Sequence, residues 1–79
     1  MMMIMFFHLR IFMKYYVYRI SKISGRKEYK RAKTLDIFVS EKLKDSCWQY
    51  SKQGATGIIK KCNDRYGWHY EYNMESVTK

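Results

Sequence analysis

Residues 14–29 read KYYVYRISKISGRKEY and carry the strongest structural signal in the chain. Its residues, mostly aromatic or β-branched, form two alternating rows: Tyr16, Tyr18 and Ile20 on one face and Tyr15, Val17 and Arg19 on the other. A period of two in residues of this kind is typical of a β-strand. Gly25 can adopt a positive φ, so the residues around it predict a turn. The whole stretch therefore predicts a hairpin, with a second, weaker strand over residues 28–33.

Shorter elements and one clear helix are expected after the hairpin. The pattern predicts a third strand over residues 34–39, a short helical turn or loop over residues 40–45, and a short strand over residues 47–50. Ser51 is then a good N-cap for a helix that Gly67 closes. The apolar stripe of this helix consists of Ala55, Ile58, Ile59, Cys62 and Tyr66. Residues 68–74 alternate again and predict a final strand.

This order of elements predicts an α+β fold: a small, mostly antiparallel sheet with one main helix packed on one face. We expect residues 14–79 to form a single basic domain. One helix cannot cover both faces of a sheet. The uncovered face should therefore carry tyrosines and basic residues, and it should meet solvent, a second subunit or a ligand.

Residues 1–13, MMMIMFFHLRIFM, are an apolar extension ahead of that domain. The run lacks the basic region and the cleavage site of a secretory signal, and a bilayer-spanning helix needs about 20 apolar residues. We therefore expect no membrane association. Three interpretations stay open: translation that starts at Met13, an extra strand or helix, and an oligomerisation segment that makes the protein a homo-oligomer. In the last case the interface residues would be Ile4, Phe6, Phe7 and Phe12.

The composition describes a folded, basic chain. Its 79 residues make one domain at most, and 16 Lys and Arg against 7 Asp and Glu give a net charge of +9. The apolar fraction of 47% and the aromatic fraction of 18% are too high for a disordered polycation. An anionic partner is therefore the first expectation.

Most of the excess charge lies in the hairpin region. Between residues 14 and 35, eight basic residues stand against Glu28 alone, a net charge of +7. Cations neutralise phosphates, and the interleaved tyrosines can stack on unpaired bases, so the sequence predicts nucleic-acid binding. RNA is preferred over duplex DNA because no helix has an obviously basic exposed face for the major groove. The predicted RNA-binding residues are Lys14, Arg19, Lys22, Arg26, Lys27, Lys30, Arg31, Lys33, Tyr16, Tyr18 and Tyr29.

Other interpretations of these residues stay open. The hairpin could be a solvated surface with its tyrosines in the core, or it could bind an acidic protein surface without nucleic acid. The helix cations could add phosphate contacts or be ordinary surface residues; they are Lys52, Lys60, Lys61 and Arg65. Trp68, Tyr70 and Tyr72 share one predicted strand face, which we expect to be core, with a base-stacking platform as the alternative.

The sequence gives little support for catalysis or metal binding. Cys47 and Cys62 have no Cys-x-x-Cys or His-x-x-x-His spacing, so we expect reduced thiols, no metal and no cofactor. A zinc site that joins them to His69 and His8 is the alternative. The carboxylates form no recognisable pair and no phosphate-binding loop is present, which leaves His69 as the only candidate general base of a small ribonuclease. We expect a protein that is not an enzyme.

Residues 15–29, YYVYRISKISGRKEY, resemble the opening of the GIY-YIG nuclease family, whose tyrosine-rich strand, Gly-Lys turn and second strand build an active site. The chain has Tyr29, Lys30 and Arg31 where that family has its second signature. No counterpart follows for the helix with the catalytic arginine or for the later metal-binding glutamate. The resemblance therefore implies a degenerate relative at most.

In length and composition, the chain also resembles the small basic early proteins of T-even phages, because it is short, lacks proline and is rich in Lys, Ile and Tyr. That group includes RNA-binding antidefence inhibitors of a host ribonuclease toxin. The resemblance implies an oligomer in the host cytoplasm that binds RNA and blocks a bacterial defence system. It would place the RNA contact on the basic, tyrosine-rich hairpin.

Overall fold

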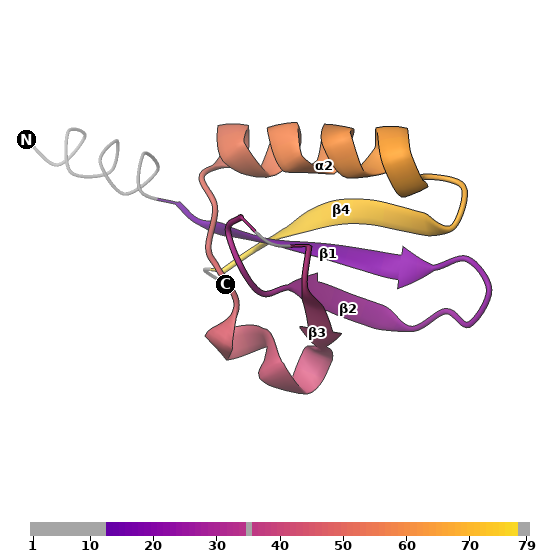
Figure 1. Ribbon diagram of the computed structural model, residues 1–79. Helices are drawn as coiled ribbons and strands as arrows, with labels where there is room; N and C mark the ends of the chain where they lie inside the picture. Colours follow the sequence, from indigo (N-terminus) through magenta and orange to yellow (C-terminus); the bar gives the residue numbers. More distant parts are fainter. Residues whose placement is uncertain (1–12, 35, 78–79) are drawn as a thin grey trace, which may run out of the picture.

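The computed structural model describes residues 13–34 and 36–77. The elements of this part of the chain are β1 (Tyr15–Ser21), β2 (Lys27–Lys30), β3 (Phe38–Ser40), the 3₁₀ helix η1 (Glu41–Ser46), α2 (Lys52–Tyr66) and β4 (Tyr70–Ser76). The strands form one antiparallel sheet in the order β3-β2-β1-β4. The helix α2 packs against β1 and β4, while η1 packs against β2 and β3 (Figure 1). The predicted α+β fold with one main helix is confirmed.

Strand β1 divides the core into two clusters because its successive side chains point to opposite faces. Tyr16 packs with Tyr29 and Cys47 on the side of η1. Val17 packs with Tyr50 and Ala55 on the side of α2. The two alternating rows read from the sequence are therefore both partly buried. A chain of this length gains stability from both clusters, since a small domain buries little surface in total.

The β1–β2 hairpin forms around Gly25, whose φ of 75° lies in the left-handed region that glycine adopts without strain. The backbone N–H of Ser21 donates to the carbonyl of Arg26 at 3.0 Å and closes the turn. Strand β2 ends at Lys30, earlier than the predicted residue 33, because the chain turns away into a loop. That loop returns where the N–H of Arg31 donates to the carbonyl of Ile37 at 2.8 Å. The third strand is consequently only Phe38–Ser40, and the prediction of a strand over residues 34–39 is wrong at its start; Leu35 lies outside the described residues.

Helix α2 begins as its sequence predicts, with the Ser51 hydroxyl accepting a hydrogen bond from the N–H of Gly54 at 3.1 Å. The apolar stripe holds along most of its length, but its last member, Tyr66, is exposed. Gly67 closes the helix in an ordinary right-handed conformation. Glycine is needed there for another reason: a Cβ atom would overlap the carbonyl group of Asn63, to which the Gly67 N–H donates.

Two further strand predictions need correction. Residues 47–50 do not form a strand; only Tyr50 forms a bridge with Tyr15, through N–H to carbonyl bonds of 2.8 and 2.7 Å. The final strand begins at Tyr70, because residues 67–69 form the turn that follows α2. Trp68 is therefore outside the sheet and 75% exposed, so the expectation that it belongs to a core face is wrong. Tyr72 is buried as expected.

The apolar extension lies outside the described residues, apart from Met13. The three interpretations of this extension therefore stay predictions. The same holds for the interface residues Ile4, Phe6, Phe7 and Phe12 and for His8 as a zinc ligand. Within the described part of the chain, no helix has the length and apolar character needed to cross a bilayer.

Candidate nucleic-acid interface

Three of the predicted RNA-binding residues are buried. Tyr16 is 5% exposed and Tyr29 fully buried, because both rings pack between the sheet and η1. Lys30 is 2% exposed, and its Nζ donates to the carbonyl of Ala32 at 2.7 Å and lies 4.0 Å from the carboxylate of Asp36. Burial lowers the pKa of Lys30, an effect that Asp36 partly offsets. These three side chains are therefore largely inaccessible to a ligand in this arrangement of the chain, and their contact with RNA stays a prediction.

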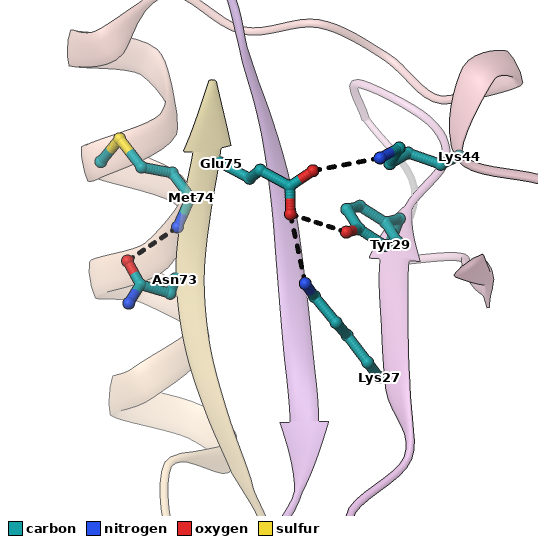
Figure 2. Close-up of polar contacts among 6 residues, drawn as sticks. All are labelled: Lys27, Tyr29, Lys44, Asn73, Met74 and Glu75. Atoms are coloured by element: carbon teal, nitrogen blue, oxygen red, sulfur yellow. Dashed lines mark hydrogen bonds and ion pairs between the residues drawn. The ribbon is translucent and has the colours of Figure 1, made fainter. Parts of the chain in front are cut away.

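Lys27 belongs to a polar network centred on Glu75, which Figure 2 shows. One carboxylate oxygen of Glu75 accepts from the Tyr29 hydroxyl at 2.8 Å and from Lys27 Nζ at 3.2 Å. The other oxygen accepts from Lys44 Nζ at 3.2 Å. Lys27 Nζ also lies 4.3 Å from the centre of the Tyr18 ring. The network connects β4 with β2 and η1, so Lys27 and Tyr18 are engaged in the fold.

The network makes the stability of the protein decrease at acidic pH. Burial of Glu75 disfavours its charged form, but hydrogen bonds from Tyr29, Lys27 and Lys44 outweigh burial, so the pKa of Glu75 lies below its ordinary value. The unfolded chain therefore binds a proton at higher pH than the folded protein does. This contribution to stability is complete above the unfolded pKa, near 4.5, and is lost as the pH falls through the lower folded pKa.

We expect Glu75→Gln to cost about 1 kcal/mol of unfolding free energy at pH 7, because the amide keeps one acceptor and loses the charge. The difference from the wild type should shrink as the pH falls below about 4. Urea melts of both proteins between pH 7 and pH 3 measure it. A difference that stays constant across this range would show that the charge of Glu75 contributes nothing.

Arg19 is held by three neighbours. Its guanidinium pairs with the carboxylate of Glu28 at 3.0 Å, across the β1–β2 ladder. The guanidinium carbon lies 4.0 Å from the ring centre of Phe38 and 4.0 Å from that of Tyr70. Cation–π contacts of this kind fix the side chain in place. Arg19 is therefore a positioned cation rather than a free surface charge.

The five remaining predicted cations are exposed, but they do not form one patch. Lys14 and Lys22 lie at opposite ends of β1, about 26 Å apart at the rise of a strand. Arg26 is in the hairpin turn with Lys22, whereas Arg31 and Lys33 are in the loop after β2. The charge of the hairpin is thus distributed along the molecule, and the sequence position of a cation does not by itself place it in a common site.

A cleft of about 340 Å³ brings cations from distant parts of the chain together. We call it the basic cleft; it lies between the loop after β2 and α2. Its charged lining consists of Lys30, Lys33, Lys61, Arg65 and Asp36, four cations against one carboxylate. The uncharged lining includes Ile58, Cys62 and Tyr66 from α2.

A second cleft, of about 180 Å³, adjoins the first and shares Asp36, Cys62 and Tyr66 with it. We call it the aromatic cleft, because its other lining residues are Arg19, Phe38, Tyr70 and Tyr72. The Tyr72 hydroxyl is buried beside the Arg19 guanidinium. Burial raises the pKa of Tyr72, so its hydroxyl stays protonated at neutral pH. The two clefts together form a groove, cationic at one end and aromatic at the other.

The part of this groove that α2 lines could be predicted from the sequence. Ile58, Cys62 and Tyr66 follow one another at four-residue spacing, and Lys61 and Arg65 lie beside them on the same side of the helix. The sequence leaves two interpretations of these cations: they add phosphate contacts, or they are ordinary surface residues. What the sequence lacked was the position of the loop after β2, which determines that Lys33 and Asp36 face this side of α2.

The described residues bring no three metal-binding side chains of the His, Cys, Asp or Glu type together. Cys47 packs with Tyr16 on the η1 side of the sheet, whereas Cys62 belongs to α2 on the other side. Both thiols are free, and burial raises the pKa of each. His69 lies in the turn before β4, where its ring stacks on Trp68 with 3.9 Å between ring centres.

Comparisons with protein-family models, curated proteins and solved structures found no match to this chain.

Proposed function

We propose that the chain is a non-enzymatic nucleic-acid-binding protein that takes single-stranded RNA in the groove beside α2. The observation that carries this proposal is the basic cleft, where the exposed cations Lys33, Lys61 and Arg65 come together from the loop after β2 and from α2. Phosphates that enter such a cleft release their condensed counterions, which favours binding. The sequence predicts the RNA-binding site on the hairpin, whereas we assign it to the groove.

The aromatic cleft supports single strands over duplexes. Exposed rings stack on bases only when the bases are unpaired, and every base has a face to offer. Tyr66 is 42% exposed and lines both clefts, so its ring is accessible next to the phosphate-binding cations. An acidic protein partner would use the cations and would leave the rings without a role.

We expect binding of single-stranded RNA to weaken steeply with salt. The slope of log K against log salt is about −0.7 per phosphate neutralised, so contacts from Lys33, Lys61 and Arg65 give a slope of about −2. Fluorescence anisotropy of a labelled RNA between roughly 50 and 300 mM salt provides the slope. A duplex of the same sequence should bind more weakly.

Two outcomes would contradict the proposal. Absence of RNA binding at low salt, together with a co-purified protein that ribonuclease does not release, would favour an acidic protein partner. Cleavage of the labelled RNA by the wild type, lost in His69→Ala, would favour a nuclease. Binding without cleavage, with and without added Mg²⁺, is the result that we expect.

The biological setting of this proposal rests on the resemblance to small phage proteins. We propose a cytoplasmic homo-oligomer that inhibits a host defence ribonuclease toxin by way of RNA. Light scattering on the purified protein tests the oligomeric state. An assay of toxin-catalysed RNA cleavage with and without this protein tests the inhibition, and an unchanged cleavage rate would contradict it.

A further inference from the structure

Two turns meet at one end of the molecule and expose large apolar side chains. The backbone N–H of Lys22, in the β1–β2 turn, donates to the carbonyl of His69, in the turn between α2 and β4, at 3.0 Å. Ile23 is 90% exposed and Trp68 is 75% exposed. These are the most exposed large apolar side chains of the described residues. Exposed apolar groups that gather at one place mark an interaction surface.

The Trp68 ring is oriented by its neighbour. His69 stacks on it with 3.9 Å between ring centres and 35° between ring planes, so one face of the indole is covered. The exposure of Trp68 leaves the opposite face accessible. A large ring that is held on one side and open on the other is a ready platform for a planar group.

The charges around Trp68 favour an anionic partner. Lys22 and Arg26 are exposed in the β1–β2 turn, and the residues of the two turns, 22–26 and 67–69, include no Asp or Glu. The carboxylates of Asp64 and Glu71 lie outside these turns, near the end of α2 and in β4. A planar ring with cations beside it matches the chemistry of a base between phosphates.

The position of Trp68 connects this end of the molecule with the groove. Tyr70 lines the aromatic cleft and follows Trp68 by two residues. A strand of RNA that leaves the aromatic cleft past Tyr70 therefore reaches the turn that carries Trp68. Figure 1 shows the turn after α2 and the β1–β2 turn at the same end of the molecule.

We propose that Trp68 is a stacking platform for an unpaired RNA base, with Lys22 and Arg26 contacting the flanking phosphates. This inference rests on the proposed function, since it extends the path of the same RNA strand. It assigns a binding role to a tryptophan for which the sequence pattern favours the core, with a base-stacking platform as the alternative. It also includes Lys22 and Arg26 of the hairpin turn in the RNA-binding interface, at a place separate from the basic cleft.

Tryptophan fluorescence tests the platform directly. The chain has two tryptophans, so Trp48→Phe leaves Trp68 as the only one. We expect the emission of that variant to be quenched when a single-stranded RNA of about 12 nucleotides is added, because a stacked base contacts the indole. Unchanged emission at RNA concentrations that saturate binding in anisotropy would overturn the proposal.

Affinity provides the second measurement. Trp68→Ala should weaken binding of the same RNA about 5- to 150-fold, the range for loss of one stacked base. Ile23→Ala is the matched control, because it removes a more exposed apolar side chain from the same end but no ring, and we expect its affinity to equal that of the wild type. Both side chains are exposed, so both variants should melt at the temperature of the wild type.

The outcomes separate the two proposals. Equal RNA affinity of Trp68→Ala and the wild type would overturn the platform and leave binding in the groove intact, whereas no RNA binding by the wild type would overturn both. Vesicles of phosphatidylserine and phosphatidylcholine test whether this surface binds a membrane instead of RNA. If they shift the Trp68 emission to the blue, and if Ile23→Ala and Trp68→Ala both weaken vesicle binding, the surface inserts into lipid and the stacking role is wrong.

Discussion

Replacing Glu75 with alanine will lower the unfolding free energy by about 2–3 kcal/mol and the melting temperature by about 10–20 °C. The carboxylate accepts hydrogen bonds from Tyr29, Lys27 and Lys44. Tyr29 is fully buried, and its hydroxyl loses the acceptor to which it donates. An orphaned buried hydroxyl costs about 1–3 kcal/mol, and the two ammonium groups lose their common counter-charge.

Glu71→Ala is the matched control for this change. Glu71 lies four residues earlier in β4 and is exposed, and its side chain forms no hydrogen bond or ion pair with another described residue. Its replacement removes the same charge from the same strand and should cost under about 0.5 kcal/mol. Thermal melts of both variants at pH 7 measure the difference. Equal losses in the two variants would mean that the network of Figure 2 contributes no more than a surface carboxylate.

A double substitution separates the hydroxyl from the charges. Tyr29→Phe combined with Glu75→Ala removes the orphaned donor while it keeps the ring in the core. We expect the double variant to be about 1–2 kcal/mol more stable than Glu75→Ala alone, because no buried polar atom is left unpaired. A double variant that is less stable than Glu75→Ala would assign the loss to the lysines instead.

Reversing the three exposed cations of the basic cleft will reduce affinity for single-stranded RNA by a factor of about 10² at 0.1 M salt. The estimate follows from about 0.7 log units per phosphate contact at that salt concentration. The variant carries Lys33→Glu, Lys61→Glu and Arg65→Glu, all at exposed positions, so the fold should persist. Circular dichroism checks this before anisotropy measures the affinity.

The control for the reversal carries an identical change of net charge outside the groove. Lys14→Glu, Lys42→Glu and Lys52→Glu are exposed and line neither cleft. We expect this variant to lose much less affinity, because charges further than about 10 Å from the RNA are screened at 0.1 M salt. If both variants lose the same affinity, the net charge of the protein and not the groove determines binding.

The parts of the fold that the sequence predicted are those with local causes. The alternation in β1, the positive φ of Gly25 and the Ser51 cap each depend on a few neighbouring residues. The α+β arrangement follows from the order of such elements. The ends of β2 and β3 were misplaced because the loop between them depends on a distant contact, the hydrogen bond from the Trp48 N–H to the Arg31 carbonyl at 2.9 Å.

The candidate site was only partly predictable, because residue type does not reveal whether a cation is free. Arg19, Lys27 and Lys30 look alike in the sequence, yet the first is held between two rings, the second pairs with Glu75 and the third is buried. Each outcome depends on residues more than five positions away or on a different strand. The groove likewise joins Lys33 to Arg65, which no pattern within a sequence window connects.

The pairing of β1 with β4 has a consequence for how this protein is made. Partners in that ladder, from Ser21 with Tyr70 to Tyr15 with Ser76, are about 50 to 60 residues apart. A ribosome that adds about 5–20 residues per second needs roughly 2–12 s to cover this distance. Before β4 is made, β1 can pair with β2 and, at Tyr15, with Tyr50, while the edge that β4 will cover stays open to chaperones or to neighbouring nascent chains. Slower translation of the codons between β1 and β4 should therefore increase aggregation, even though the amino-acid sequence is unchanged.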